Sequence, residues 1–527
     1  MTYSFEYKTL SSCCRQDLQI RLSSCRRQDL CNYKFCIIIL ILCAPFFSCK
    51  TSSQSVINKK YPAKKLKEDY KIFQGALEES HPGLYWFTPK SEIDKDFSEG
   101  YSAIEDSMTE RQFRTLLLKV ITPIRCGHTS VSYSKKYSKY LDTAGLKLFP
   151  LAFKVWKDTL AVTANINRND TVLKRGTVVT SINNYPAKKL IDTFFNYITG
   201  DGYSVAGRYQ SLSSYGTFGV LYKNVLGLTD TFSINYIDQN GLESNVVIPV
   251  FTPAQDSAEK SDTLSPEKYT AKERRTLSSF STRHIQVDTT LKSAYMLLNT
   301  FSNGTNLKKF FKSSFKNIKK FGIKYLVIDV RSNGGGEAGN STMLTQYLSD
   351  HNFKIADSLY AIKRSSKYRD HIRFQPIYWM ITSVITKKQS DGNYHFGYYE
   401  RHVFKPFTKY HFDGNIYILT GGNSFSATTL FAQELKGQKN VMIIGEETGG
   451  GGYGNTAWII PELTLPNTKL RVGIPKFRFV MRRELVKEGR GVIPDIYAAP
   501  TAKDIQNGID VKIEKARQLI LEANRSN

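Results

Sequence analysis

The stretch that decides the fold runs from Gly421 to Gly454 and reads GGNSFSATTLFAQELKGQKNVMIIGEETGGGGYG. An apolar run, Ile416–Leu419, precedes it, and a second, Val441–Ile444, lies inside it; both have the length and composition of buried strands. The run from Ala427 to Lys436 between them is expected to be a helix. Strand, tight polar turn, helix and strand form a βαβ unit, so the stretch predicts an α/β sheet.

The polar turn places Ser426 at the start of this helix and at the carboxyl end of the preceding strand. Open α/β sheets bind their ligands at that edge. A serine in this position also serves as an N-cap, whose hydroxyl accepts a hydrogen bond from a backbone N–H. Ser426 is therefore a candidate nucleophile or a helix cap, and other parts of the chain must decide between the two roles.

The composition of the chain argues against several classes of protein. The 527 residues predict about two to four domains, and a hydrophobic fraction of 41% is enough for real cores. The formal net charge is +26, but the basic residues are dispersed and form no stripe with interleaved aromatics. We therefore expect a solvated lysine-rich surface and no nucleic-acid partner, with attraction to an anionic envelope surface as an alternative. The sequence has no His-Glu-x-x-His pattern and no Cys/His cluster, so neither a metal nor a cofactor is expected.

The N-terminal residues predict export. Phe35–Ser48 is an apolar run of 14 residues that follows Lys34 and several arginines, and it is too short for a comfortable membrane span. The run ends at Cys49 and a polar tether follows, which resembles a bacterial lipoprotein signal whose cysteine becomes lipidated. An ordinary secretory signal or a short anchor is the alternative. Each reading sets residues 1–55 apart from the fold and places the body in the bacterial cell envelope, outside the cytoplasm.

Four segments are expected after this signal. Residues 56–145 are mostly helical, from apolar spacings of three and four, and carry His128 in a turn before a strand. Residues 146–252 are strand-rich and resemble a PDZ-like module, which captures peptides by adding a strand to a sheet edge; a plain β-rich insert is the alternative. Residues 253–283 are charged and predict a linker. Residues 284–527 predict the α/β core.

Two further segments of this core are an irregular stretch and the end of the chain. Residues 355–412 are rich in Tyr, Phe, Arg and Lys without a clear period, and we expect them to cover a cleft. A helix from Lys503 to Glu522 is expected to close the chain.

Three consecutive glycines, Gly334–Gly336, follow the apolar run Leu326–Val330. Without side chains, their backbone N–H groups can approach a ligand closely, and a helix starting next favours negative charge. Gly334 and Gly335 are thus candidate donors of one half of an oxyanion hole, and the N–H of Ala427 is the candidate for the other half. One such donor lowers a barrier by about 3 kcal/mol. Neither glycine run ends in Gly-Lys-Ser/Thr, which argues against a phosphate loop.

Four motifs occur in order along the chain: Leu326–Gly336, Asn423–Ala427, Gly445–Gly450 and Gly491–Ile496. Together they resemble the tail-specific, or C-terminal-processing, serine peptidase family. That family also contains the tricorn core protease and the interphotoreceptor retinoid-binding protein modules. The resemblance covers roughly residues 60–520. It implies a crotonase-like (ClpP/crotonase-type) α/β core, often with a PDZ-like module ahead of it, and cleavage of peptides or protein tails.

The resemblance places the nucleophile of the family on Ser426. In the tail-specific branch the base is a lysine 25 residues later, but that position here is Gly451. The tricorn-like branch uses a histidine from the N-terminal part and a later glutamate, and these fall on His128 and Glu488. Glu484 is the weaker candidate for the carboxylate.

The side chains of Ser426, His128 and Glu488 have complementary chemical roles. A serine hydroxyl is a weak nucleophile until a neighbouring base takes its proton, and imidazole accepts and returns that proton near neutral pH. A carboxylate fixes the imidazole tautomer. The sequence therefore predicts an exported serine peptidase with Ser426 as nucleophile, His128 as general base and Glu488 as its orienting carboxylate. Gly127 stands where the tricorn type has a serine, so a fourth polar member stays open. A non-catalytic peptide- or lipid-binding protein on the same fold is the alternative, because the lysine is missing.

Overall fold

A computed structural model of the chain describes residues 57–253 and 269–525. The predicted export signal, its lipidation site Cys49 and the tether lie outside the described residues. Within the described ranges, no helix combines the length and the apolar character needed to cross a membrane.

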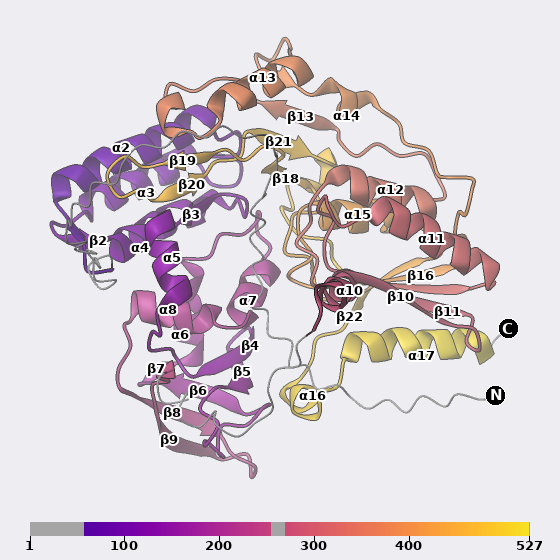
Figure 1. Cartoon of the computed structure of the whole chain (residues 1–527), viewed down its shortest axis with the longest axis horizontal. Helices are drawn as coiled ribbons and strands as arrows, with labels where there is room; N and C mark the ends of the chain where they lie inside the picture. The colour runs from indigo at the N-terminus through magenta and orange to yellow at the C-terminus, as the bar shows by residue number, and fades with distance from the viewer. Residues whose placement is uncertain (1–56, 254–268, 526–527) are drawn as a thin grey trace, which may run out of the picture. The chain divides into compact units, whose positions relative to one another are not determined.

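A six-stranded sheet forms the predicted α/β core (Figure 1). Its strands in spatial order are β10 (Arg283–Asp288), β11 (Ser293–Leu298), β12 (Tyr325–Asp329), β16 (Asn415–Thr420), β17 (Val441–Gly445) and β22 (Ile496–Tyr497). Neighbours from β11 to β22 are parallel, and β10 pairs antiparallel with β11. Every residue of β12 is buried, which fits the continuous apolar run of a parallel strand covered on both faces.

Helices cover both faces of this sheet. One face carries α11 (Leu307–Lys320), α12 (Ala338–Leu348) and α15 (Ala427–Leu435), and the other carries α17 (Val511–Arg525), as Figure 1 shows. Ile328 of β12 joins a cluster with Phe311 and Phe431 on the first face. Its neighbour Val327 joins a cluster with Ile520 on the second. Adjacent strand residues point to opposite faces, so one strand contributes to both cores.

The predicted N-terminal helical region forms a further core. Its elements are β1 (Lys60–Tyr61), α2 (Ala63–Ser80), α3 (Lys90–Ser102), β2 (Met108–Thr109), α4 (Glu110–Ile121), η1 (Thr122–Ile124), β3 (Ser130–Ser132) and α5 (Lys135–Thr143). Strand β3 pairs with β20 (Arg471–Gly473), which pairs with β19 (Glu462–Thr464). Leu463 and Val472 from these late strands pack with Phe73 and Phe113. Residues from both ends of the chain therefore build one cluster.

The β-rich segment contains one five-strand path with helices beside it. Its elements are β4 (Leu151–Trp156), β5 (Thr159–Asn165), β6 (Val178–Ile182), β7 (Tyr185–Pro186), α6 (Ala187–Phe195), α7 (Ala206–Ser213), α8 (Thr217–Val225), β8 (Thr231–Ile237) and β9 (Glu243–Pro249). Strand β4 is an edge strand, yet its Val155 N–H donates to Ser213 Oγ of α7 (2.9 Å). A helix therefore already occupies this edge at Val155, and peptide capture by the module stays a prediction.

The irregular segment 355–412 has its own secondary structure. It contains β13 (Ser358–Ala361), η3 (Arg369–His371), α13 (Gln375–Ile385), β14 (Lys387–Lys388), β15 (Tyr394–His395) and α14 (Gly397–Arg401). Three of these strands join β21 (Phe477–Val480) and β18 (Gly454–Ala457) in a five-stranded sheet of order β14-β15-β13-β21-β18. Leu359 and Phe479 lie in the core of this sheet.

Two segments differ from the sequence expectation. Part of the predicted linker is the helix α10 (Ala271–Thr282), which a capping box starts: Glu273 N–H donates to Thr270 Oγ1 (3.2 Å), and Thr270 N–H donates to the Glu273 carboxylate (2.7 Å). The predicted closing helix is two helices, α16 (Ala502–Asn507) and α17, because Gly508 adopts the left-handed conformation (φ 68°) that ends a helix.

Candidate active site

Ser426 occupies a strained turn between β16 and α15. Its φ of 56° and ψ of −124° lie in a region that residues with a side chain seldom adopt, at a cost on the order of 1–3 kcal/mol. Ser426 precedes the helix, but its side chain makes no capping hydrogen bond. The half-buried hydroxyl is therefore not used to cap α15.

Hydrogen bonds fix this turn to the end of β12. Ser424 Oγ donates to the Val330 carbonyl (2.8 Å) and accepts the Gly421 N–H (3.2 Å). Phe425 N–H donates to the Asn333 carbonyl (3.2 Å). The serine turn and the glycine run after β12 thus form one unit, as their shared sheet edge predicted.

Gly335 lies directly against Ser426. It has a φ of 102°, and a Cβ there would stand 2.8 Å from Ser426 Cβ and 3.1 Å from Ala427 N, so only glycine fits. The Gly335 N–H, predicted as an oxyanion donor, is already donated to Asn333 Oδ1 (2.9 Å). Ala427 starts α15, where an N–H has no intrahelical partner. The Gly334 N–H has no acceptor in the part of the chain that the structure describes, so these two donors are available.

His128 lies next to the serine turn. Its ring centroid is 4.7 Å from that of Phe425, the residue before Ser426. Burial lowers the pKa of His128 to about 4, so the imidazole is neutral at pH 7, as a general base must be. Among the described residues no hydrogen bond joins His128 to Ser426, and His128 Nδ1 is buried without a partner.

The Phe425 ring packs directly against Gly127. A Cβ at Gly127 would come within 2.6 Å of Phe425 Cζ and 3.2 Å of Asp201 Oδ1. A serine at this position, as in the tricorn-like pattern, does not fit while Phe425 keeps this position.

Glu488 lies in an exposed turn, and Glu484 is exposed on the short 3-10 helix η4 (Arg483–Leu485) before it. Within the described ranges, neither carboxylate bonds to His128 Nδ1, which is buried without a partner. The turn is anchored by Gly489, whose carbonyl accepts the Tyr203 N–H (2.7 Å). The structure therefore brings Ser426 and His128 into one neighbourhood, whereas the assignment of Glu488 stays a prediction.

Asp201 is the residue of this site that the sequence did not reveal. Its Oδ1 accepts the Gly127 N–H (2.7 Å), and the backbone of Gly451 also donates to it. Asp201 is buried, its second oxygen has no partner among the described residues, and burial raises its pKa to about 7. The carboxylate thus links the histidine loop to the position where the lysine of the tail-specific branch is missing. The flanking Gly200 and Gly202 signal a turn but no function.

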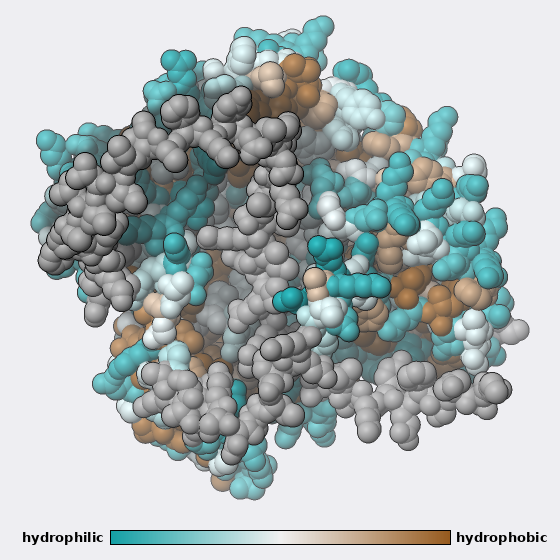
Figure 2. All heavy atoms as spheres, viewed as in Figure 1, coloured by the Kyte–Doolittle hydropathy of each residue, from teal (hydrophilic) through white to brown (hydrophobic). Residues whose placement is uncertain are grey.

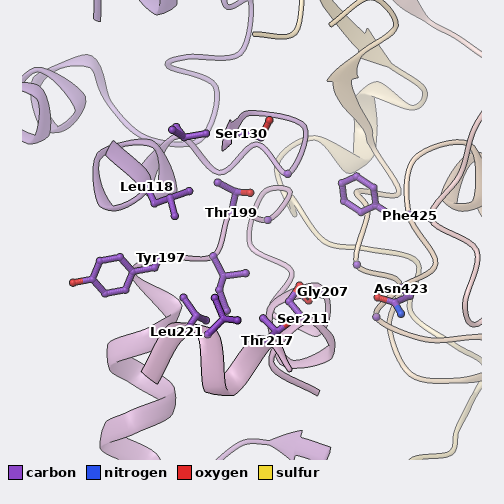
Figure 3. A pocket seen from close by; sticks show the side chains of 18 of the residues that line it. Leu118, Ser130, Tyr197, Thr199, Gly207, Ser211, Thr217, Leu221, Asn423 and Phe425 are labelled. Atoms are coloured by element: carbon purple, nitrogen blue, oxygen red, sulfur yellow. Dashed lines mark hydrogen bonds between the residues drawn. The ribbon is translucent and has the colours of Figure 1, made fainter. Parts of the chain in front are cut away.

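A cavity of about 740 Å³ opens beside these groups. Gly127, Gly334 and Phe425 line it together with residues of the β-rich module, and Figure 3 shows Phe425 across the cavity from Tyr197 and Leu118. Its volume is in the range of pockets that hold a ligand of several peptide units. The lining contains no residue of segment 355–412, so the prediction that this segment covers a cleft is not supported at this cavity.

The amino-acid sequence of residues 292–498 matches the family model of Peptidase family S41. This segment belongs to peptidase family S41. It contains Ser426, Gly334 and Glu488, and it begins after His128 and Asp201. The match confirms, for this segment, the predicted enzyme class, a serine-type peptidase and hydrolase, and the predicted family resemblance. A comparison with curated proteins found no match.

Solved structures share the fold well beyond this S41 segment. A mutant of CPAF aligns with a TM-score of 0.61 and 11% identity, over 87% of this chain and 96% of the CPAF chain. Mature CPAF complexed with lactacystin aligns with a TM-score of 0.56 and 13% identity, over 87% and 98% of the two chains. At these identities the likeness shows the fold alone, and its coverage includes segments outside residues 292–498.

Proposed function

We propose that this S41 peptidase hydrolyses peptide bonds through an acyl-enzyme on Ser426, with His128 as general base and Glu488 as the carboxylate that orients it. The observation that supports this most is the strained turn. In it the Ser426 hydroxyl makes no capping hydrogen bond, and Ser426 directly precedes the first N–H of α15. A scissile carbonyl above Ser426 would place its developing oxyanion near the N–H groups of Ala427 and Gly334.

The reaction needs only these groups and water. His128 takes the proton of Ser426 as Oγ attacks the carbonyl carbon, and then gives that proton to the leaving amine when the C–N bond breaks. A water molecule, deprotonated by His128, releases the acyl group and restores the serine.

The catalytic contacts must tighten when substrate binds. His128 Nδ1 has no partner among the described residues, and its ring packs on Phe425. Catalytic hydrogen bonds are often long in a free enzyme and form fully only in the complex. Phe425 lines the cavity, so a substrate that moves this ring frees His128 to turn toward Ser426 and toward a carboxylate.

Asp201 acts in this scheme as a positioning residue. Through the Gly127 N–H it holds the loop that carries His128, and through Gly451 it holds the loop after β17. The substrate class is an extended peptide or an unfolded protein tail, because the open cavity combines apolar side chains such as Leu118 and Val220 with polar ones such as Asn423. Export to the cell envelope with a lipid on Cys49, and substrate capture by a PDZ-like module, belong to the same proposal.

Peptide hydrolysis by the full chain and three variants tests the proposal. Ser426→Ala is expected to lower kcat/KM about 10³-fold or more, and His128→Ala and Glu488→Ala by about 10²-fold or more. Ser313→Ala, an exposed serine on α11, is the matched control and should keep wild-type activity. Lactacystin should inhibit, since mature CPAF was solved with it. Unchanged hydrolysis by Ser426→Ala would show that the fold works without this nucleophile, and a loss in Glu484→Ala alone would move the carboxylate to Glu484.

A further inference from the structure

Helix α13 carries an apolar stripe that faces solvent. Phe374, Ile377, Met380, Ile381 and Val384 recur at the three- and four-residue spacing of one helix face. Their exposed fractions run from 38% for Ile381 to 81% for Val384, whereas Thr382 is the buried residue of the helix. Figure 2 shows hydrophobic atoms gathered at the top of this view, where Figure 1 places α13. An exposed patch of this kind marks an interaction site.

The inner side of α13 is held by Ile385, which packs against the core that contains Leu359 and Phe479, and by polar contacts at the end of the helix. Within the helix, Thr382 Oγ1 donates to the Tyr378 carbonyl (2.8 Å), and Thr386 Oγ1 donates to the Thr382 carbonyl (2.6 Å). Arg364 donates to the hydroxyl and the carbonyl of Thr386. Beyond the helix, Ile372 pairs with Leu463 across an isolated bridge. The helix is thus held in place while its apolar stripe is left for a partner.

Basic residues flank the stripe along the sequence. Residues 363–388 contain seven Lys or Arg side chains and one acidic residue, Asp370. Six of the seven are exposed, on both sides of the helix in sequence: Lys363, Lys367, Arg369, Arg373, Lys387 and Lys388. Asp370 makes one long ion pair, with Arg369 (3.9 Å). A partner for this surface must therefore be apolar at its centre and anionic around it.

We propose that α13 is a membrane-surface element that inserts its apolar stripe into the headgroup region of an anionic lipid bilayer. Its 11 residues extend about 16 Å, which is too short to span a bilayer but suits a helix that lies in the interface. Trp379, half exposed, is the residue type that prefers this depth. Each nearby Lys or Arg adds about 1 kcal/mol of attraction to an anionic surface.

The same charges argue against two other partners. A second copy of this chain would bring two basic rims together in a protein with a net charge of +26, and like charges across an interface are unfavourable. A peptide on its way to Ser426 has no path defined by α13, because no residue of this helix lines the cavity beside the serine turn. The bilayer proposal does not depend on the catalytic assignment.

Vesicle flotation of the full chain tests the proposal. Wild type should float with vesicles containing phosphatidylglycerol and much less with pure phosphatidylcholine. Val384→Asp and Ile377→Asp should each weaken binding to the anionic vesicles about tenfold or more. Val247→Asp, which changes a valine exposed on β9, is the matched control and should bind like wild type. Lys387→Glu combined with Lys388→Glu should reduce the preference for anionic lipid.

Trp379 fluorescence separates α13 from the N-terminal segment, which all variants share. Brominated lipid should quench wild type more than Trp379→Phe, and the difference should vanish in Val384→Asp. Equal binding of Val384→Asp and Val247→Asp, or no Trp379-dependent quenching, would overturn the proposal. It also fails if Val384→Asp splits a dimer in sedimentation while vesicle binding stays unchanged, because the stripe would then belong to a second copy.

Discussion

Backbone, rather than side chains, surrounds Ser426 on several sides. A Cβ at Gly335 would stand 2.8 Å from Ser426 Cβ, and one at Gly450 would stand 2.9 Å from Ser426 N. The two glycine runs therefore have a steric reason: the loops that carry them both approach one serine. The sequence predicted the two runs, but it could not reveal that Gly127, some 300 residues away, plays the same part for Phe425.

Replacing Gly127 with serine tests this packing. The new Cβ would meet the Phe425 ring at 2.6 Å, so Gly127→Ser is expected to lose about 1–3 kcal/mol of unfolding free energy. Phe425→Ala in the same chain should recover part of the loss, because it removes the ring. Thermal unfolding of the two single variants and the double variant measures the coupling. Purely additive effects would show that the ring and the new side chain do not collide.

Two substitutions of Asp201 are expected to differ in their effect on activity. Asp201→Asn keeps an oxygen that can accept the Gly127 N–H and should retain most activity. Asp201→Ala removes the acceptor, so the loop that carries His128 loses the hydrogen bond from the Gly127 N–H. This variant should lower kcat about tenfold or more, with a smaller effect on KM. Equal activity of both variants would remove Asp201 from the positioning role.

Asp201 also predicts a pH dependence of stability. Its pKa is about 7 in the folded protein, above the ordinary value of 3.8. The folded state therefore binds the proton more tightly, and the resulting stability is fully present below about pH 4 and lost as the pH rises through 7. Asp201→Asn should raise Tm relative to wild type more at pH 8 than at pH 5. The exposed Asp158→Asn serves as control, and a constant Tm difference across this range would contradict the prediction.

The acid limb of the pH–rate profile should lie at a lower pH than it would for a histidine of ordinary pKa. Burial lowers the pKa of His128 to about 4, and only the neutral imidazole accepts a proton from Ser426. In the free enzyme, kcat/KM should therefore fall only below about pH 5. A kcat/KM profile of the full chain measures this limb. A midpoint near 6.5 would mean that His128 is solvated in the enzyme that binds substrate.

Between elements, a single buried carboxylate joins the N-terminal helices to the late hairpin. Asp69 of α2 accepts the N–H groups of Asn467 (2.8 Å) and Thr468 (2.8 Å) and the Thr468 hydroxyl (2.6 Å). Asp69→Ala leaves these buried donors unpaired and is expected to cost about 3–5 kcal/mol of unfolding free energy. Chemical denaturation checks this, with Glu78→Ala, an exposed residue of the same helix, as control. A loss below about 1 kcal/mol would show that the hairpin holds without this contact.

The sequence predicted those elements whose pattern is local. Helix α12 follows the glycine run Gly334–Gly336 as expected, and β12, β16 and β17 lie within a residue or two of the apolar runs that predicted them. Helix α13 was not predicted, because most of its apolar residues face solvent and its buried residue is Thr382. Such an inverted pattern has no core-facing stripe to recognise.

At the scale of the whole molecule, the order of motifs along the chain predicted the family and the sheet, whereas the site depends on approaches that no motif encodes. His128 comes from the N-terminal helical core, Asp201 from the loop between α6 and α7 of the β-rich segment and Ser426 from the α/β sheet. The predicted domain limits follow the chain, but β3 pairs with β20 across them. Contacts of this range depend on packing among all three parts, so single-sequence patterns place the residues on elements without assembling them.

Labelling of the full chain with a fluorophosphonate probe, followed by mass-spectrometric site mapping, tests the central claim most directly. The probe should modify Ser426 in wild type and in Ser313→Ala, and His128→Ala should slow the modification about 10²-fold or more. Labelling of another serine, no labelling at all, or an unchanged rate in His128→Ala would contradict the assignment of Ser426 and His128 as nucleophile and base.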